Sequence, residues 1–242
     1  MLFAAILAGG SGTRMKFSDL PKQFLMLGDK PVIIHTVEKF LLVDEFVKVY
    51  VGINPEWHGY FEDLVDKYLS SAKERIQIID GGKDRTSTLT NVLTDIREKA
   101  KEAGVSTEEV YVVTHDAVRP FVDLRIIQDN INKLQECTMV DTVIPAVDTI
   151  IVSSDHETIE SIPVRNTMYQ GQTPQSFQLA AFDRIFAQLT EAEKAVLTDA
   201  CKVFTLKGEP VHLVEGSAAN IKITTVVDLK LAHALIGETY VK

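Results

Sequence analysis

The residues best suited to chemistry lie directly after the first apolar run of the sequence. The run LFAAIL is followed by AGGSGTRM, which brings Gly9, Gly10 and Gly12 next to Arg14, and Lys22 follows in a Leu-Pro-Lys-Gln segment. Glycines allow several backbone N–H groups to turn toward one anion. Two cations beside such a loop favour phosphate binding over a flexible turn with solvated side chains.

This loop differs from the two common phosphate-binding motifs. It lacks the third glycine of a dinucleotide fingerprint, because Met15 stands in that place, and no GK[ST] closes it as in a Walker loop. The second predicted strand ends in GIN, not in the acidic residue that would bind a ribose. The missing third glycine and the missing acidic residue both argue against a dinucleotide-dependent oxidoreductase.

The elements that must position this loop alternate between strands and helices. Apolar runs rich in β-branched residues predict buried parallel strands at 3–7, 48–53, 75–80 and 110–115. Between and after them, apolar side chains at helical spacing predict helices whose stripes start at Ile33, Phe61, Leu89 and Ile127. The alternation indicates an α/β fold with a doubly wound, mostly parallel open sheet of the Rossmann-like type, whose ligand crevice lies at the strand ends.

Two further polar segments follow predicted strands and therefore lie at the same crevice. GGKDRTST (81–88) opens a predicted helix. The alternative to ligand binding is that the segment only caps this helix, through Thr86 or Ser87. THDAVRPF (114–121) ends the next strand and brings Asp116 to the crevice. His115 is predicted to be a packed or hydrogen-bonded neighbour, because no other histidine stands at ligand spacing from it.

The pattern changes between Asp141 and Phe177. This segment alternates apolar and polar residues without a helical stripe, which predicts a protruding β-arm that turns near Asp155. Its apolar content is high for a solvent-exposed excursion, so the arm is predicted to form a homodimer interface. The alternative is an arm folded back on its own domain. Beyond it we expect helices at 178–189 and 198–204, strands at VHLVEG and NIKITT, and a closing helix.

Composition limits the class of protein. The 242 residues suit one domain over 1–242, and a net charge of −9 argues against nucleic acid or an anionic membrane as a partner. Cys137 and Cys201 lie far apart, which suggests free thiols in a reducing cytoplasm. The apolar start has no charged region before it, so neither an export signal nor a membrane span is expected.

Taken together, the motifs resemble the sugar- and polyol-phosphate nucleotidyltransferases. LAGGSGTRM with LPKQFL is similar to their nucleotide-binding signature, and GGKDRTST with THDAVRPF is similar to the cytidylyltransferase branch. That branch includes the methylerythritol-phosphate enzymes of isoprenoid synthesis and the ribitol-5-phosphate enzymes of teichoic acid synthesis. VRNTMYQGQTPQSF and LTDACKV resemble the ribitol enzymes more closely, and the likeness runs from the first strand to NIKITT.

The resemblance implies transfer of CMP from CTP to D-ribitol 5-phosphate with release of pyrophosphate. It implies catalytic roles for Arg14 and Lys22 at the departing pyrophosphate, and for Arg165 and Lys222 at the polyol phosphate. It also implies contacts with CTP at thirteen positions in two segments, namely Leu7, Ala8, Gly9, Gly10, Ser11, Gly12, Gly82, Lys83, Asp84, Arg85, Thr86, Ser87 and Thr88.

The same resemblance extends to a cofactor and to partners. A carboxylate beside a triphosphate needs a cation between them, so Asp116 is the predicted Mg²⁺ ligand. Arg119 would face the phosphate of the second substrate, and Thr198 and Asp199 would hold polyol hydroxyls unless they cap the following helix. In the family the arm crosses to a neighbour, which would place Arg165 in the partner's site. A reductase that supplies ribitol phosphate is a further expected partner.

Two rival functions share this pattern. The first is an isoprenoid cytidylyltransferase that acts on 2-C-methyl-D-erythritol 4-phosphate, which differs only in its acceptor pocket. The second is a non-catalytic nucleotide-binding or scaffold protein. The presence of Arg14, Lys22, Asp116, Arg165 and Lys222 together argues against a scaffold, because a scaffold needs none of them.

Overall fold

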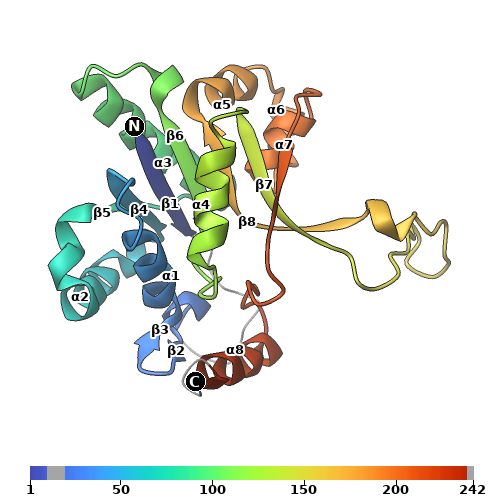
Figure 1. The fold of residues 1–242 in the computed structure, drawn as a ribbon, viewed down its shortest axis with the longest axis horizontal. Helices are drawn as coiled ribbons and strands as arrows, with labels where there is room; N and C mark the ends of the chain where they lie inside the picture. Colours follow the sequence, from blue (N-terminus) through green and yellow to red (C-terminus); the bar gives the residue numbers. More distant parts are fainter. Residues whose placement is uncertain (10–19, 239–242) are drawn as a thin grey trace.

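The computed structural model describes residues 1–9 and 20–238, so Gly10, Ser11, Gly12 and Arg14 lie outside the described residues. A seven-stranded sheet with the order β5-β4-β1-β6-β8-β7-β9 forms the centre, with helices on both faces (Figure 1). Its strands are β1 (Leu2–Ala8), β4 (Lys48–Ile53), β5 (Ile76–Asp80), β6 (Tyr111–Asp116), β7 (Met139–Pro145), β8 (Tyr169–Gln178) and β9 (His212–Glu215).

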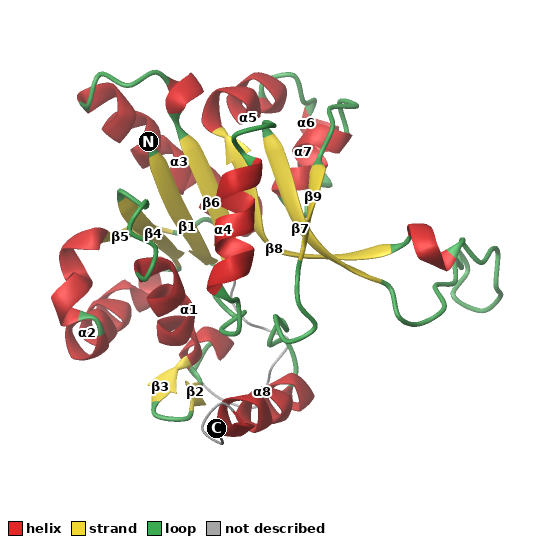
Figure 2. Cartoon of the chain, viewed as in Figure 1, coloured by secondary structure: helices red, strands yellow, loops and turns green. Residues whose placement is uncertain are grey.

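The helices that follow these strands match the predicted alternation (Figure 2). They are α1 (Val32–Leu41), α2 (His58–Tyr68), α3 (Arg85–Glu102), α4 (Leu124–Lys133), α5 (Leu179–Phe186), α6 (Glu191–Ala195), α7 (Ala200–Thr205) and α8 (Val226–Glu238). A small second sheet pairs β2 (Met26–Leu27) with β3 (Lys30–Pro31). In the part of the chain described here, no helix has both the length and the apolar character that crossing a bilayer requires.

Strand β1, which lies inside the sheet, explains why the domain has two main cores. Successive side chains of a strand point to opposite faces of the sheet. Ala4, Ile6 and Ala8 therefore join the core formed with α1, α2 and α4. The intervening residues Phe3, Ala5 and Leu7 join the core formed with α3, α5 and α7. A strand that is buried on both faces reads as the continuous apolar run seen in the sequence.

The position of β1 in the sheet also creates the crevice. β1 pairs in parallel with β4 on one side and with β6 on the other. The chain therefore leaves β1 in one direction and later returns to its opposite side. At such a reversal the loops that follow the two strands diverge, and ligands bind between them.

The prediction of a β-arm over 141–177 was only partly right. β7 and β8 belong to the main sheet, where β8 runs antiparallel to both β6 and β7. The end of β7 and the start of β8 extend from the body together with the segment 146–168 between them (Figure 1), and this segment holds one isolated bridge between Val152 and Ser161. The alternating pattern misled because a strand within an antiparallel sheet has the same period of two as a free hairpin.

Two elements near the C-terminus differ from the prediction. NIKITT is not a strand: Ile223 is buried in a small cluster with Leu27, Val32, Val118 and Ala232, and its N–H donates to the carbonyl of Val118 at 2.9 Å. Helix α6 was not predicted, although Thr190 and Glu193 form a capping box at its start. Five residues are too few to show an apolar period.

Candidate active site

A cleft of about 360 Å³ opens at the carboxyl ends of β1 and β6. It brings together charged residues from four separate parts of the chain. Its lining among the described residues consists of Leu7, Ala8, Gly9, Lys22, Gln23, Arg85, Thr88, Asp116, Ala117, Val118, Thr198 and Lys222. The cleft therefore holds the described parts of the first loop, the segment after β5, the end of β6 and the segment after β9.

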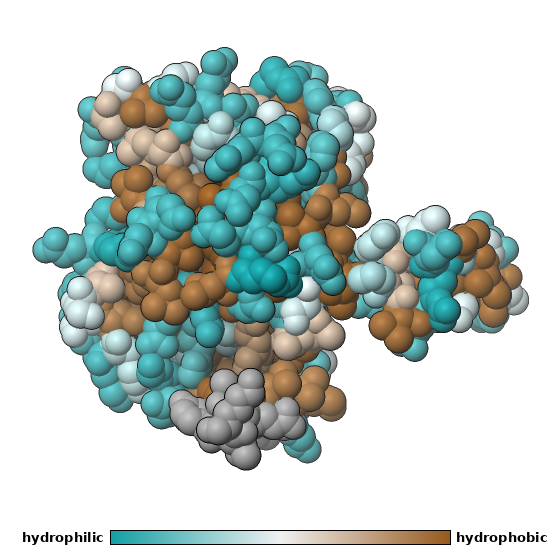
Figure 3. Space-filling model, viewed as in Figure 1, coloured by the Kyte–Doolittle hydropathy of each residue, from teal (hydrophilic) through white to brown (hydrophobic). Residues whose placement is uncertain are grey.

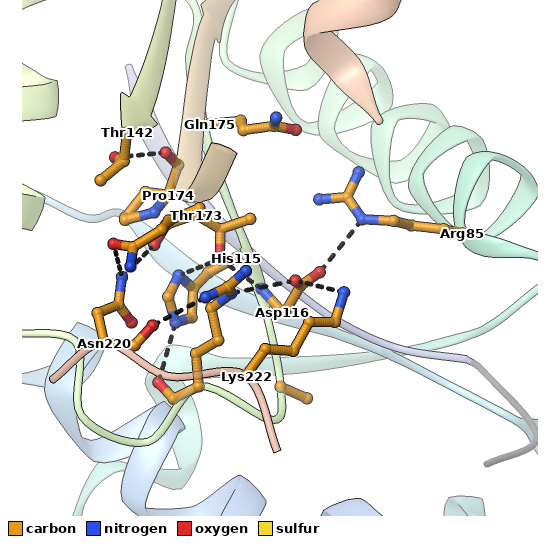
Figure 4. Close-up of polar contacts among 12 residues, drawn as sticks. Arg85, His115, Asp116, Thr142, Thr173, Pro174, Gln175, Asn220 and Lys222 are labelled. Atoms are coloured by element: carbon orange, nitrogen blue, oxygen red, sulfur yellow. Dashed lines mark hydrogen bonds and ion pairs between the residues drawn. The ribbon is translucent and has the colours of Figure 1, made fainter. Parts of the chain in front are cut away.

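Asp116 is the centre of this arrangement. Its Oδ1 lies 3.2 Å from Nε of Arg85, and its Oδ2 lies 2.9 Å from Nζ of Lys222 (Figure 4). Nε of Arg119 lies 3.4 Å from the same Oδ2. Burial would raise the pKa of Asp116, but the charges of Arg85, Lys222 and Arg119 outweigh it and hold the pKa well below its usual range. The carboxylate is therefore ionised at neutral pH.

The charges that line the cleft favour an anionic ligand. Lys22, Arg85 and Lys222 line it together with a single carboxylate, Asp116, among the described residues. The local charge is thus positive although the chain carries a net charge of −9. Basic side chains that converge in a cleft attract anions and raise their local concentration.

The first loop packs directly against the start of α3. A Cβ at Gly9 would lie 2.2 Å from Oγ1 of Thr88, so only glycine fits there. The same hydroxyl accepts a hydrogen bond from the N–H of Gly82 at 3.1 Å. Gln23 is buried and donates to the carbonyl of Ala8 at 3.1 Å, which fixes the start of the loop from the other side. The prediction that these segments share one crevice is confirmed.

The residues of 81–88 divide into local and cleft-facing roles. Asp84, rather than Thr86 or Ser87, is the N-cap of α3, and its Oδ1 accepts from the N–H of Ser87 at 2.7 Å. This bond and the others that it makes with Ser87 lower the pKa of Asp84. Arg85 and Thr88 line the cleft, whereas Lys83 is exposed and does not.

Arg119 was predicted to face the phosphate of the second substrate, but it does not line the cleft. Arg119 is 8% exposed, and its Nη1 donates to the carbonyl of Asn220 at 2.8 Å. The side chain thereby bridges Asp116 and the segment that carries Lys222.

Thr198 and Asp199 were predicted to hold hydroxyls of the polyol. Thr198 lines the cleft, whereas Asp199 caps α7 by accepting from the N–H of Lys202 at 2.9 Å.

Of the predicted catalytic residues that the structure describes, Lys22 and Lys222 line the cleft and Arg165 lies apart from it. Arg165 lies in the short 3₁₀ helix Arg165–Thr167 of the protruding segment, and its Nη1 donates to the carbonyl of Val147 at 3.3 Å. Figure 1 shows this segment extending away from the sheet. Within one chain, Arg165 is therefore not part of the cleft.

Thr173 and Asn220 are two residues that sequence reasoning did not single out. Asn220 is fully buried and donates through Nδ2 to the carbonyl of Thr173 at 2.8 Å (Figure 4). The hydroxyl of Thr173 accepts from the N–H of Asp116 at 3.2 Å. The only local signal was the Thr-Pro pair in QTPQSF, which is unusual inside a strand that lies between two others.

Known proteins resemble the chain over nearly its whole length. Residues 2–238 match the family model described as 2-C-methyl-D-erythritol 4-phosphate cytidylyltransferase (IspD). A protein named ribitol-5-phosphate cytidylyltransferase from Streptococcus pneumoniae serotype 2 is 51% identical over 98% of this chain and 99% of its own. The protein of the same name from serotype 19F is 50% identical over the same shares.

Solved structures give the same picture for the fold. The 4-diphosphocytidyl-2C-methyl-D-erythritol synthase from Anaerococcus prevotii superposes with a TM-score of 0.79 at 26% identity, over 98% of each chain. The 2-C-methyl-D-erythritol 4-phosphate cytidylyltransferase from Francisella tularensis gives a TM-score of 0.76 at 25% identity, over 96% of this chain and 98% of its own.

Proposed function

Because the chain belongs to the 2-C-methyl-D-erythritol 4-phosphate cytidylyltransferase family and is a cytidylyltransferase, we propose that it transfers CMP from CTP to D-ribitol 5-phosphate. The products are CDP-ribitol and pyrophosphate. The observation that carries the proposal is the cleft at the ends of β1 and β6, where Lys22, Arg85 and Lys222 converge with Asp116. The acceptor is taken from the relatives that are 51% identical over 98% of the chain.

The chemistry of such a transfer suits these side chains. A phosphate oxygen of the acceptor attacks the α-phosphorus of CTP, and the bond to the leaving pyrophosphate breaks. The acceptor phosphate is already ionised at neutral pH, so no general base is required. Catalysis of phosphoryl transfer depends mainly on positioning and on charge stabilisation. We assign Lys22, together with Arg14, to the departing pyrophosphate and Lys222 to the phosphate of the acceptor.

Mg²⁺ is the proposed cofactor, and Asp116 is its proposed protein ligand. Mg²⁺ is commonly held by one or two carboxylates together with phosphate oxygens of the substrate. Asp116 is the only carboxylate that lines the cleft in the described part of the chain. Oδ2 has two cationic neighbours, Lys222 and Arg119, whereas Oδ1 has only Arg85. A carboxylate oxygen offers two acceptor sites, so Oδ1 retains one for the ion and the donor set fits when CTP is present. The ion would neutralise charge on the triphosphate.

The nucleotide is proposed to bind along the first loop and the start of α3. Gly9 and Thr88 line the cleft at their point of contact, and Arg85 extends into it from the N-terminus of the helix. Backbone N–H groups at such a helix start, together with a glycine loop, favour phosphate groups. The loop residues Gly10, Ser11 and Gly12 lie outside the described residues, so their contacts with CTP stay a prediction.

A homodimer through the segment 146–168 is the proposed assembly. The segment exposes several large apolar side chains among polar ones (Figure 3). They are Val147, Ile151, Val152, Ile159, Ile162 and Val164, with exposed fractions between 40% and 79%. Burial of this surface against a second copy would be favourable. In such a dimer Arg165 enters the cleft of the partner and contacts the acceptor phosphate.

Two further assignments follow from the proposed acceptor. CDP-ribitol would serve as a precursor of teichoic acid, and a reductase would supply the ribitol phosphate. A second acceptor, 2-C-methyl-D-erythritol 4-phosphate, is favoured by the name of the matching family model and of the solved structures. Membership of a cytidylyltransferase family, together with the charged cleft of this chain, argues against the alternative of a non-catalytic protein.

Release of pyrophosphate tests the proposal. The purified protein is incubated with CTP and Mg²⁺ and, in parallel, with ribitol 5-phosphate, 2-C-methyl-D-erythritol 4-phosphate or glycerol phosphate. We expect fast release with ribitol 5-phosphate alone. Equal or faster release with another acceptor would overturn the assignment of the substrate, and release with none would overturn the proposed reaction.

A further inference from the structure

His115 precedes Asp116 in β6, yet it does not line the cleft. Its side chain is fully buried, and its ring packs against Phe40 with 5.1 Å between the ring centroids. Both ring nitrogens have a polar partner. Nε2 lies 3.1 Å from the carbonyl oxygen of Arg119, and Nδ1 lies 2.9 Å from Oγ1 of Thr173. These contacts give the ring a role beyond filling space.

The two partners determine where the ring carries its proton. A carbonyl oxygen only accepts hydrogen bonds, so Nε2 must be the protonated nitrogen that donates to Arg119. Of the partners that the structure describes for the buried Thr173 hydroxyl, Nδ1 is the one able to accept its proton, so Nδ1 carries no proton and the ring is neutral. Nδ1 therefore accepts from the hydroxyl of Thr173. That hydroxyl can in turn accept from the N–H of Asp116, which lies 3.2 Å away.

This chain of hydrogen bonds encloses the turn that carries the cleft carboxylate. It begins at the N–H of Asp116, passes through Thr173 and His115, and ends at the carbonyl of Arg119. Within the turn, the N–H of Arg119 donates to the carbonyl of Asp116 at 3.1 Å. The backbone of residues 116–119 is thus fixed at both ends by one buried ring.

We propose that His115 is a positioning residue of the transfer reaction. Its neutral ring, protonated on Nε2, holds the 116–119 turn and so sets the place of the Asp116 carboxylate beside Lys222 and Arg85. The hydroxyl proton of Thr173 is committed to this ring and does not serve a ligand. A displacement of about 1 Å in a catalytic group costs on the order of 100-fold in rate, which gives the scale of the effect. The kinetic part of the inference rests on the proposed function.

Three substitutions of His115 separate its two hydrogen bonds. In His115→Asn the side-chain oxygen takes the place of Nδ1 and keeps the bond from Thr173. In His115→Gln the side-chain nitrogen takes the place of Nε2 and keeps the bond to Arg119. His115→Phe retains the ring and loses both bonds. We expect kcat to fall about 10- to 100-fold in His115→Phe, and less in the other two variants.

A matched pair of threonines distinguishes positioning from a general loss of stability. Thr114 and Thr173 are both buried, and the Thr114 hydroxyl donates to the carbonyl of Gln175 at 2.8 Å without contacting the turn. Thr114→Val removes one hydrogen bond and Thr173→Val removes two, so we expect both variants to lower Tm, Thr173→Val somewhat more. Only Thr173→Val should lower kcat, with a much smaller change in KM for CTP. An equal kcat in the two variants would overturn the proposal.

The tautomer of His115 is measured without any activity assay. Nitrogen-15 NMR of the ligand-free protein is expected to show a protonated Nε2 and an unprotonated Nδ1 for this residue. A proton on Nδ1 would overturn the proposal. If the wild-type protein transfers CMP to no polyol phosphate, the proposed function fails, whereas the NMR result still decides whether His115 forms the inferred chain.

Discussion

The ammonium group of Lys222 lies 2.9 Å from Oδ2 of Asp116, although the two residues come from opposite halves of the chain. Asp116 is nearly buried, with a side chain that is 9% exposed, whereas the side chain of Lys222 is 40% exposed. One member of the pair is therefore fixed by the core, and the other is open to a ligand. An anion that enters the cleft meets a lysine already held in place.

Replacement of Lys222 with methionine should impair catalysis more than stability. Asp116 keeps Arg85 and Arg119 as partners, so no buried charge is left unpaired. Loss of one charge that stabilises the transition state typically costs about 3–4 kcal/mol, or on the order of 100-fold or more in kcat. The exposed Lys230 on α8 provides a matched control, because Lys230→Met removes the same charge away from the cleft. Equal kcat values for the two variants would contradict the assignment.

Alanine at Lys22 or at Arg14 should lower turnover by orders of magnitude while the protein stays folded. The proposed contacts act on charge that develops as pyrophosphate leaves, so kcat should fall more than the affinity for CTP. Steady-state kinetics together with circular dichroism of each variant measure the two effects. A variant that retains a near-normal kcat would remove that residue from the proposed mechanism.

Asp141 should make the protein less stable as the pH rises. Burial raises the pKa of this carboxyl to about 6, and Gln175 donates to its Oδ1 at 3.1 Å. The folded protein therefore holds a proton that the unfolded chain releases near its ordinary pKa of about 4. The resulting stability is fully present below pH 4 and is lost as the pH rises through about 6.

Asp141→Asn removes this pH dependence, because the amide does not ionise. Relative to the wild type, the variant should gain about 2 kcal/mol of unfolding free energy between pH 4 and pH 7.5. Urea denaturation at both pH values measures the difference, with Asp148→Asn on the exposed segment as the control. A constant difference between variant and wild type at the two pH values would show that Asp141 is not the group responsible.

The parts of the fold that the sequence predicted well are those with strong local signals. Asp123 stands at the N-cap of α4, where its Oδ1 accepts from the N–H of Ile126 at 3.3 Å. Thr225 and Asp228 cap α8 in the same way. A cap is fixed by residues three positions apart, so it can be read from a short stretch of sequence.

The parts that were missed depend on contacts between distant residues. Nothing near Arg119 in the sequence indicates that this residue is buried. Nor does it indicate that the guanidinium group of Arg119 donates to the carbonyl of Asn220. A site role for Lys222 was expected only from resemblance to a family, because a lone lysine in NIKIT looks like a surface charge, and its pairing with Asp116 was not predicted. The hydrogen bonds of Thr173 likewise depend on which strands become neighbours in the sheet.

Mixed dimers test whether Arg165 works in the cleft of the partner subunit. Arg14→Ala and Arg165→Ala are each expected to be nearly inactive as homodimers. If sites are shared across the interface, a mixed dimer contains one site with both residues intact, and about half of the activity per mixed dimer returns. Analytical ultracentrifugation and exchange of labelled subunits confirm assembly. Failure to recover activity after proven exchange, or full activity of a wild-type monomer, would contradict the shared site.

Competition between acceptors is the most direct test of the central claim. The protein is given CTP, Mg²⁺ and equal amounts of ribitol 5-phosphate and 2-C-methyl-D-erythritol 4-phosphate in one mixture, and the products are identified by mass. Their initial ratio equals the ratio of the two kcat/KM values. We predict CDP-ribitol as the main product, with one pyrophosphate released for each molecule formed. A mixture in which the cytidylylated methylerythritol predominates would contradict the assignment.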